Sequence, residues 1–320
     1  MNIVVIGAQW GDEGKGKIVD YLAGDASVVT RFSGGANAGH TIVNGGVTYK
    51  LHLVPSGIVY PGKTVILGTG MVIDVESLFA ELKTLEEQGI AWKGRVLISE
   101  RAHLVFPTYK AMDLEMEKKR RNPIGTTGRG IGIAYAQKAD RDGVRCCDLF
   151  NPDVYKTLKD EEKAFIEPYM SRIKDMIVDP VSYMAERKGE NKLFEGAQGA
   201  LLDIDTGTYP YVSSGYSIAS GACAGGGIGA LDIDAVYGVF KAYNTRVGNG
   251  GRCPAPRPSR RPLFLGIPWA FLSVSAAPRG QRGRHGEARG AFHGALRGCS
   301  GGISDFPTPH APPTEGPTSR

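Results

Sequence analysis

The sequence predicts an α/β fold with a mainly parallel central sheet, helices on both faces and a core like that of phosphate-binding-loop NTPases. Two observations carry this prediction. Short apolar segments alternate with helical segments along most of the chain, and glycine-rich turns follow several of the apolar segments. In parallel sheets, ligands bind beyond the carboxyl ends of the strands, where these turns fall.

The first element is an apolar run, Ile3–Ile6, which predicts a buried parallel strand, followed by a glycine-rich turn and a helix over 16–22. This arrangement aims backbone N–H groups and a positive helix end at a phosphate. The turn contains Gly11-x4-Gly16-Lys17, the spacing of a phosphate-binding loop, but Ile18 stands where such loops carry Ser or Thr. Two simpler interpretations remain open, a tight turn without a ligand and an Asp12 that only stabilises the start of the helix.

The remaining elements follow in order. Asp74 is a good cap for a helix whose apolar face holds Leu78, Phe79, Leu82 and Leu85, and Gly89 lies just beyond its end. We expect further strands at 28–32, 47–53, 64–67, 95–99, 192–195 and 235–240, and helices at 108–121 and over most of 153–188. In the last region, the predicted core stripe is Met170, Ile173, Met176 and Ile177.

Composition excludes several protein classes. A chain of 320 residues with 42% hydrophobic and 22% charged residues is typical of a soluble protein with one large domain or two. No apolar run approaches the ~18 residues needed to span a bilayer, and Met1-Asn2 leads directly into a strand without a signal peptide. The five cysteines are sparse and lack metal-ligand spacing, so we expect free thiols and a cytoplasmic location without a membrane partner.

Charge divides the chain at residue 250. Residues 251–320 hold ten arginines and three acidic residues, which leaves 28 basic and 30 acidic residues in 1–250. The same tail holds 11 of the 19 prolines and shows no sustained helix or strand period apart from an apolar patch at 263–274. We therefore expect two parts, a folded domain over 1–250 and a tail over 251–320 that is disordered or the product of a misread frame.

Several long sequence motifs in the first 250 residues resemble those of a known family. GDEGKGK at 11–17 and GGANAGHT at 34–41 are followed by IGTTGRGIG at 124–132, FEGAQGALLDIDTGTYPYVSS at 194–214 and KAYNTRVGNG at 241–250. In this order, they resemble adenylosuccinate synthetase. Family members continue the last word with Pro-Phe-Pro-Thr, whereas this chain reads Gly-Arg-Cys-Pro.

The resemblance implies that GTP, IMP and L-aspartate react to give adenylosuccinate, the first committed step from IMP toward AMP. GTP phosphorylates the O6 atom of IMP after a base removes the N1 proton, and the amine of aspartate then displaces phosphate. Asp12 corresponds to the base, His40 to the acid that contacts the transferring phosphoryl group, and Gln198 to a further catalytic residue. Mg²⁺ is the implied cofactor, held by Asp12 and the Gly39 carbonyl, and a homodimer is the implied assembly.

The resemblance also implies two sets of binding residues. The GTP and phosphate set is Gly11, Asp12, Glu13, Gly14, Lys15, Gly16, Lys17, Gly39, His40 and Thr41. The IMP set is Asp12, Lys15, Asn37, Ala38, Gly39, His40, Thr127, Arg141, Gln198 and Ser213. In the family, the arginine equivalent to Arg141 reaches the IMP of the neighbouring subunit. Asp203 and Asp205 could suggest a metal, but beside Leu201-Leu202 we interpret them as structural.

The family places an arginine-rich loop for aspartate, a Lys-x-Asp element for guanine and a late closing loop further along the chain. None is recognisable in 251–320, so we expect an IMP and phosphate half-site with poor or no turnover. Nothing before residue 250 distinguishes guanine from adenine. Two alternatives remain, a GTP-binding NTPase or switch without ligase activity, and a nucleic-acid binder acting through the basic tail. We expect no nucleic-acid partner, because aromatic residues do not alternate with the tail's arginines.

Overall fold

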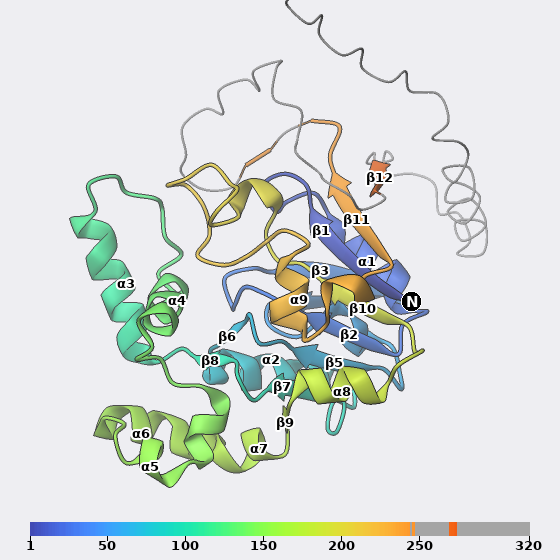
Figure 1. The fold of residues 1–320 in the computed structure, drawn as a ribbon. Coiled ribbons are helices and arrows are strands. Elements are labelled where there is room, and N and C mark those ends of the chain that lie inside the picture. Colours follow the sequence, from blue (N-terminus) through green and yellow to red (C-terminus); the bar gives the residue numbers. More distant parts are fainter. Residues whose placement is uncertain (244, 247–268, 274–320) are drawn as a thin grey trace, which may run out of the picture. The chain divides into compact units, whose positions relative to one another are not determined.

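The architecture is built around one parallel sheet, seen in a computed structural model that describes residues 1–243 and 245–246 and the backbone of 269–273. The sheet has eight strands in the order β12-β11-β1-β10-β2-β5-β7-β9, and every neighbouring pair is parallel (Figure 1). Its strands are β1 (Asn2–Gly7), β2 (Val28–Arg31), β5 (Thr64–Leu67), β7 (Val96–Ser99), β9 (Ile177–Val178), β10 (Lys192–Glu195), β11 (Ala235–Phe240) and β12 (Trp269–Ser273). The predicted α/β class with a parallel sheet is confirmed.

Helices connect these strands. They are α1 (Lys15–Ala23), α2 (Val75–Glu87), α3 (Pro107–Lys119), α4 (Ile131–Asp140), α5 (Pro152–Tyr155), α6 (Asp160–Ile166), α7 (Met170–Lys174), α8 (Pro180–Glu186) and α9 (Gly221–Gly226). Two short pairs lie outside the main sheet, the antiparallel β3 (His40–Asn44) and β4 (Val47–Leu51), and the parallel β6 (Val72–Ile73) and β8 (His103–Leu104).

Two apolar cores lie on opposite faces of the sheet. In β1, Val5 belongs to one core and Val4 to the other, because successive side chains of a strand point to opposite faces. The core of Val5 packs against α1 and α2, whereas the core of Val4 includes Met184 of α8 and Ala222 of α9. Helices therefore cover both faces, as the sequence predicts.

Local signals account for most element boundaries. The Asp74 side chain caps α2 by accepting a hydrogen bond from the Ser77 N–H, and the predicted face of Leu78, Phe79, Leu82 and Leu85 is buried. The predicted strands at 64–67, 192–195 and 235–240 are confirmed to the residue. The other expected strands and the two expected helices at 16–22 and 108–121 shift by at most two residues at either end.

The stretch 153–188 departs from the prediction. It is mostly helical, but β9 interrupts it at Ile177, where the chain adds an edge strand beside β7. Ile173 and Met176 are buried as expected, whereas Ile177 belongs to this strand and not to a helical stripe. A two-residue strand between helices is set by its neighbour in the sheet, which local periodicity does not contain.

The predicted tail is described at one place only. Trp269–Ser273, inside the apolar patch, form β12 at the edge of the sheet next to β11. At this stretch the structure has a strand where a disordered or misread tail is expected. Residues 251–268 and 274–320 lie outside the described residues, and the boundary at 250 stays a prediction.

Two further expectations can be compared with the described residues. Cys146, Cys147 and Cys223 are free thiols, as predicted, while Cys253 and Cys299 lie outside the described part. Among the helices of that part, none has both the length and the apolarity to cross a membrane.

Candidate active site

The carboxyl ends of four adjacent strands of the sheet lie in one region. In the order β11-β1-β10-β2, these strands are followed by residues 241–246, 8–14, 196–199 and 32–39. Three of these segments are the glycine-rich turns of the sequence, and the fourth is the KAYNTR word. The convergence at one edge of a parallel sheet is the arrangement in which α/β proteins bind nucleotides.

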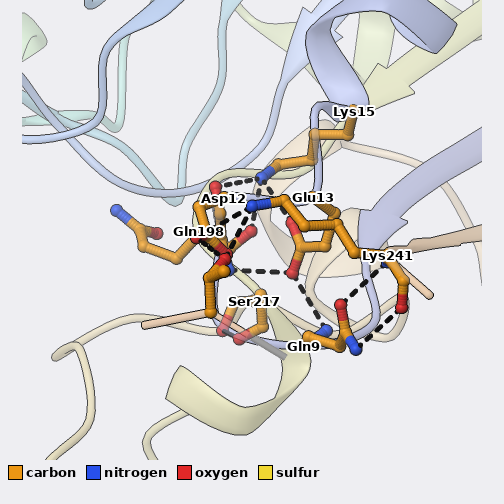
Figure 2. A network of polar contacts seen from close by, with 10 residues as sticks. Gln9, Asp12, Glu13, Lys15, Gln198, Ser217 and Lys241 are labelled. Carbon is orange, nitrogen blue, oxygen red and sulfur yellow. Dashed lines mark hydrogen bonds and ion pairs between the residues drawn. The ribbon is translucent and has the colours of Figure 1, made fainter. Parts of the chain in front are cut away.

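The buried side chain of Glu13 stabilises the loop after β1. This side chain is 2% exposed, and its Oε1 accepts hydrogen bonds from the N–H groups of Gln9 (2.9 Å) and Gly11 (2.8 Å). Its Oε2 lies 3.5 Å from Lys15 Nζ, which donates to the carbonyls of Gly11 (3.3 Å) and Gln198 (2.5 Å). The Glu13 carboxylate therefore holds the loop's own backbone, and the prediction that Glu13 contacts phosphate is not tested by this geometry (Figure 2).

Close backbone approaches explain two of the glycines. A Cβ on Gly11, whose φ is +90°, would lie 3.0 Å from the backbone of Gln198. A Cβ on Gly34, at φ +88°, would lie 2.9 Å from Ala197 Cβ and 3.3 Å from Gln198 Nε2. Both positions therefore require glycine, because a side chain would push apart loops that meet at the 196–199 turn.

Asp12 lies at the centre of the convergence. Its Oδ2 accepts hydrogen bonds from Lys241 Nζ (3.1 Å) and from the Thr245 hydroxyl, whereas its buried Oδ1 has no hydrogen-bond partner among the described residues. Partial burial acts to raise the pKa of Asp12, but the hydrogen bonds from Thr245 and Lys241 outweigh it, so the pKa lies below its ordinary value. Helix α1 starts at Lys15 with Gly14 as its N-cap and has no acidic residue in its first turn, so Asp12 does not stabilise the start of the helix from that turn.

His40 lies against the start of the same helix. A Cβ on Gly16 would be 3.4 Å from His40 Cβ, and His40 Nε2 is 3.0 Å from Ser56 Oγ and 3.5 Å from Glu195 Oε1. Burial lowers the pKa of His40, although the Glu195 carboxylate opposes this effect. The Ser56 hydroxyl and the Glu195 carboxylate are groups with which this imidazole can share a proton.

A buried arginine supports the loop that carries Asn37 and His40. Arg31 donates to the His52 carbonyl and, more weakly, to the carbonyls of Gly35 and Ala38 (3.4 Å each). Burial lowers its pKa, and Glu195 and Glu81 compensate for its charge. Asn37 Oδ1 is buried without a hydrogen-bond partner in the described part of the chain, which makes it a second acceptor open to a ligand.

The remaining predicted residues have few side-chain contacts in the described part of the chain. Ser213 Oγ donates only weakly to the Gly215 carbonyl (3.5 Å), and Lys17, Thr41, Thr127 and Arg141 are exposed. Arg141 ends α4 at φ +67°, and neither it nor Thr127 makes a side-chain hydrogen bond within the described residues. The structure therefore brings Gly11, Asp12, Glu13, Lys15 and Gln198 together, with His40 beside Gly16, but not Thr127 and Arg141.

Tyr135 connects the outer loops to this centre. Its hydroxyl accepts from the Gly34 N–H (3.0 Å) and donates to the Gly70 carbonyl (2.6 Å), and burial raises its pKa to about 12.

Asp203 is fully buried and accepts hydrogen bonds from the N–H groups of Asp205, Thr206 and Ser217. The structural interpretation of Asp203 is therefore confirmed.

Sequence reasoning missed four polar residues of this region: Arg31, Glu195, Lys241 and Thr245. Glu195, Lys241 and Thr245 stand inside words that carry the resemblance, so their position in those words was the available signal. Arg31 has no such signal, because an arginine at the end of an apolar strand is equally typical of a surface residue.

Fold and site together define an α/β protein that binds nucleotides at the carboxyl edge of its sheet. The adenylosuccinate synthetase family model matches residues 4–256. The chain belongs to the adenylosuccinate synthetase family.

Individual relatives agree with this assignment. The chain is 45% identical to adenylosuccinate synthetase of Acetivibrio thermocellus, over 86% of this chain and 71% of the relative, and 48% identical to that of Clostridium novyi, over 77% and 64%. The fully ligated Plasmodium falciparum adenylosuccinate synthetase has a TM-score of 0.72 at 40% identity, covering 78% of this chain and 64% of that structure. The chain thus spans about two thirds of the length of these relatives.

Proposed function

We propose that this chain carries the site for GTP-dependent ligation of IMP and L-aspartate to adenylosuccinate, with residues 1–246 supplying the IMP and phosphate side and with turnover impaired relative to full-length members of the family. Family membership supports the reaction class. The observation that carries the proposal is the Asp12 carboxylate, which has one oxygen held by two donors and the other buried without a partner. A buried oxygen without a donor costs free energy, and a ligand N–H group or a cation would remove that cost.

In this proposal, Asp12 removes the N1 proton of IMP through Oδ1, which makes O6 a better nucleophile toward the γ-phosphoryl group. His40 donates a hydrogen bond to the phosphoryl group in transfer, and Lys15 and Lys17 contact phosphate oxygens. Asn37 Oδ1 and Gln198 bind the IMP base. Exposed Thr127 and Arg141 and half-buried Ser213 would complete the IMP site.

The residues present fit a divalent cation. The Asp12 carboxylate, which lacks a full set of donors, is the type of anionic ligand that Mg²⁺ prefers, and the Gly39 carbonyl would be a second ligand. Bound Mg²⁺ would neutralise charge on the phosphate oxygens. The proposal assigns protein ligation to these two residues, and no cluster of three or more His, Cys, Asp or Glu side chains suited to a metal occurs in the described part.

We further propose a homodimer in the cytoplasm. Arg141 is exposed at the end of α4, and an exposed arginine can reach the IMP of a partner subunit only in a dimer. Light scattering on the purified chain tests this proposal, because a monomer at micromolar concentration would remove that role for Arg141.

The test of the proposed function separates binding from turnover. Calorimetry should detect IMP binding to the 320-residue chain, and Asp12→Asn should weaken it only severalfold. Absorbance should follow adenylosuccinate formation from GTP, IMP and aspartate, with a loss of at least about 100-fold in Asp12→Asn. GTP hydrolysis that needs no IMP, together with absent IMP binding, would contradict the proposal and favour an NTPase.

A further inference from the structure

The segment after β11 contacts the loop after β1 through Lys241, Thr245 and Arg246. The two strands are paired in parallel from Ile3 with Ala235 to Gly7 with Val239, and the Ala8 N–H extends the ladder to the Val239 carbonyl (2.8 Å). Beyond the strand ends, Arg246 stacks over Trp10 at 4.2 Å from the ring centroid and donates to the Tyr211 carbonyl (3.0 Å). The chain leaving β11 therefore has fixed contacts at both ends of residues 241–246.

The backbone of Lys241 is fixed by one side chain of the loop. Gln9 Oε1 accepts from the Lys241 N–H (2.9 Å), and Gln9 Nε2 donates to the Lys241 carbonyl (3.3 Å). A primary amide offers one acceptor and two donors, so it can pair with both backbone groups of one residue as a neighbouring strand would. This pair sets where the Lys241 side chain begins relative to the β1 loop (Figure 2).

The Lys241 side chain ends on Asp12. Its Nζ contacts Asp12 Oδ2 (3.1 Å) and Thr245 Oγ1 (2.6 Å), and the Thr245 hydroxyl donates to the same Oδ2. Both side chains of the ion pair are 24% exposed, so solvent screens the contact less than it would screen a pair on the open surface. The Lys241 and Thr245 donors thus use one carboxylate oxygen, and Oδ1 has no hydrogen-bond partner in the described part.

Resting on the proposed function, we propose that Lys241 is the positioning residue for Asp12: it fixes Oδ2 and thereby presents Oδ1 to the substrate. A carboxylate rotates over a broad range about its last torsion, and two donors on one oxygen remove that freedom. Displacements of about 1 Å at a reacting group cost roughly 100-fold in rate, so the orientation of Asp12 has a large effect on turnover. Lys241 touches no reacting atom in this role.

Hydrogen exchange measured by mass spectrometry tests the positioning without any substrate. Lys241→Met keeps the length of the side chain and removes the charge, so the amides of residues 8–14 should exchange about tenfold faster. Lys241→Arg should restore part of the protection, because a guanidinium can donate to the same oxygen. Lys110→Met is the matched control, since Lys110 pairs with Asp74 (2.7 Å) at 31% exposure in a different region, and it should leave residues 8–14 unchanged.

Kinetics give a second readout that a purely structural role would not produce. Lys241→Met should lower kcat by about 10- to 100-fold and leave the KM values of IMP and GTP within about threefold. Unchanged exchange over residues 8–14 in Lys241→Met would overturn the positioning role. Weaker GTP binding with unchanged exchange would instead make Lys241 a phosphate ligand. A wild-type chain that neither binds IMP nor turns over would contradict the proposed function and leave the exchange result standing.

Discussion

Asp12 and Glu13 are adjacent carboxylates whose surroundings give them different tasks. Glu13 is buried and uses Oε1 to accept hydrogen bonds from its own loop, whereas Asp12 is partly exposed and contacts residues that follow β11. From the sequence alone, both residues belong to one predicted phosphate-binding motif, GDEGKGK at 11–17. Their contacts separate them, because Glu13 is buried against its own loop, whereas Asp12 points to the segment that follows β11.

The first prediction concerns the buried member of the pair. Glu13→Gln keeps one acceptor oxygen but removes the charge opposite Lys15, so we expect the free energy of unfolding to fall by about 2–3 kcal/mol. Urea denaturation measures this change. Glu87→Gln is the control, because Glu87 pairs with Lys83 at the surface and its loss should cost less than about 0.5 kcal/mol. Equal losses in the two variants would contradict the role assigned to Glu13.

The second prediction concerns pH. Burial, with Lys138 and Arg145 nearby, lowers the pKa of His103 to about 4, while the unfolded chain takes up a proton near pH 6.5. The unfolded state therefore binds more protons between these values, and stability falls as the pH drops from about 6.5 toward 4.

His103→Gln should flatten that dependence. Because the residue is only partly buried, we expect the wild-type chain to lose about 1 kcal/mol more than the variant between pH 7 and pH 5. Urea titrations at the two pH values measure the difference, and the variant's stability at pH 7 is its own control. Parallel losses in both proteins would show that His103 does not contribute.

At the scale of an element, α2 shows how one side chain can both start a helix and form an ion pair. Asp74 Oδ1 accepts from the Ser77 N–H (3.3 Å), while its Oδ2 accepts from the Ser77 hydroxyl (2.8 Å) and from Lys110 Nζ (2.7 Å). The cap could be predicted from the sequence because it is local. The ion pair joins α2 to α3 and could not be predicted locally.

The third prediction separates these two contributions. Asp74→Ala removes the cap and the ion pair and should cost about 2 kcal/mol, whereas Asp74→Asn keeps a capping oxygen and should cost less than about 1 kcal/mol. Thermal unfolding of both variants measures the two costs. If Asn proves as destabilising as Ala, the ion pair with Lys110 outweighs the cap.

At the scale of the whole molecule, the strand that opens the chain lies inside the sheet. β1 pairs with β10 on one side and β11 on the other, so partners separated from it by about 190 and 230 residues in sequence hold it in place. Residues 2–7 thus contribute to both cores and support the loop that carries Asp12.

The fourth prediction uses this placement. Val4→Ala removes two methyl groups from a fully buried position in β1, and we expect a loss of about 2–3 kcal/mol in the free energy of unfolding. Val178→Ala makes the same change in the edge strand β9, where the side chain is only partly buried, and should cost less than about 1 kcal/mol. Urea denaturation compares them, and similar losses would contradict the difference between centre and edge.

The sequence by itself determined the fold class, most helices and strands, the α2 cap and the glycine-rich words of the site, because each of these depends on neighbours within a few residues. It did not place β9 or β12, whose pairing partners lie far away in the chain.

Only the tertiary structure decided which of the two carboxylates is buried against its own loop, and which residues contact the other one. The contacts of Asp12 with Lys241 and Thr245, and of His40 with Glu195, join segments about 230 and 155 residues apart. Such contacts exist only after parallel strands bring their carboxyl ends together, because the sheet, and not local propensity, sets the distances between those ends.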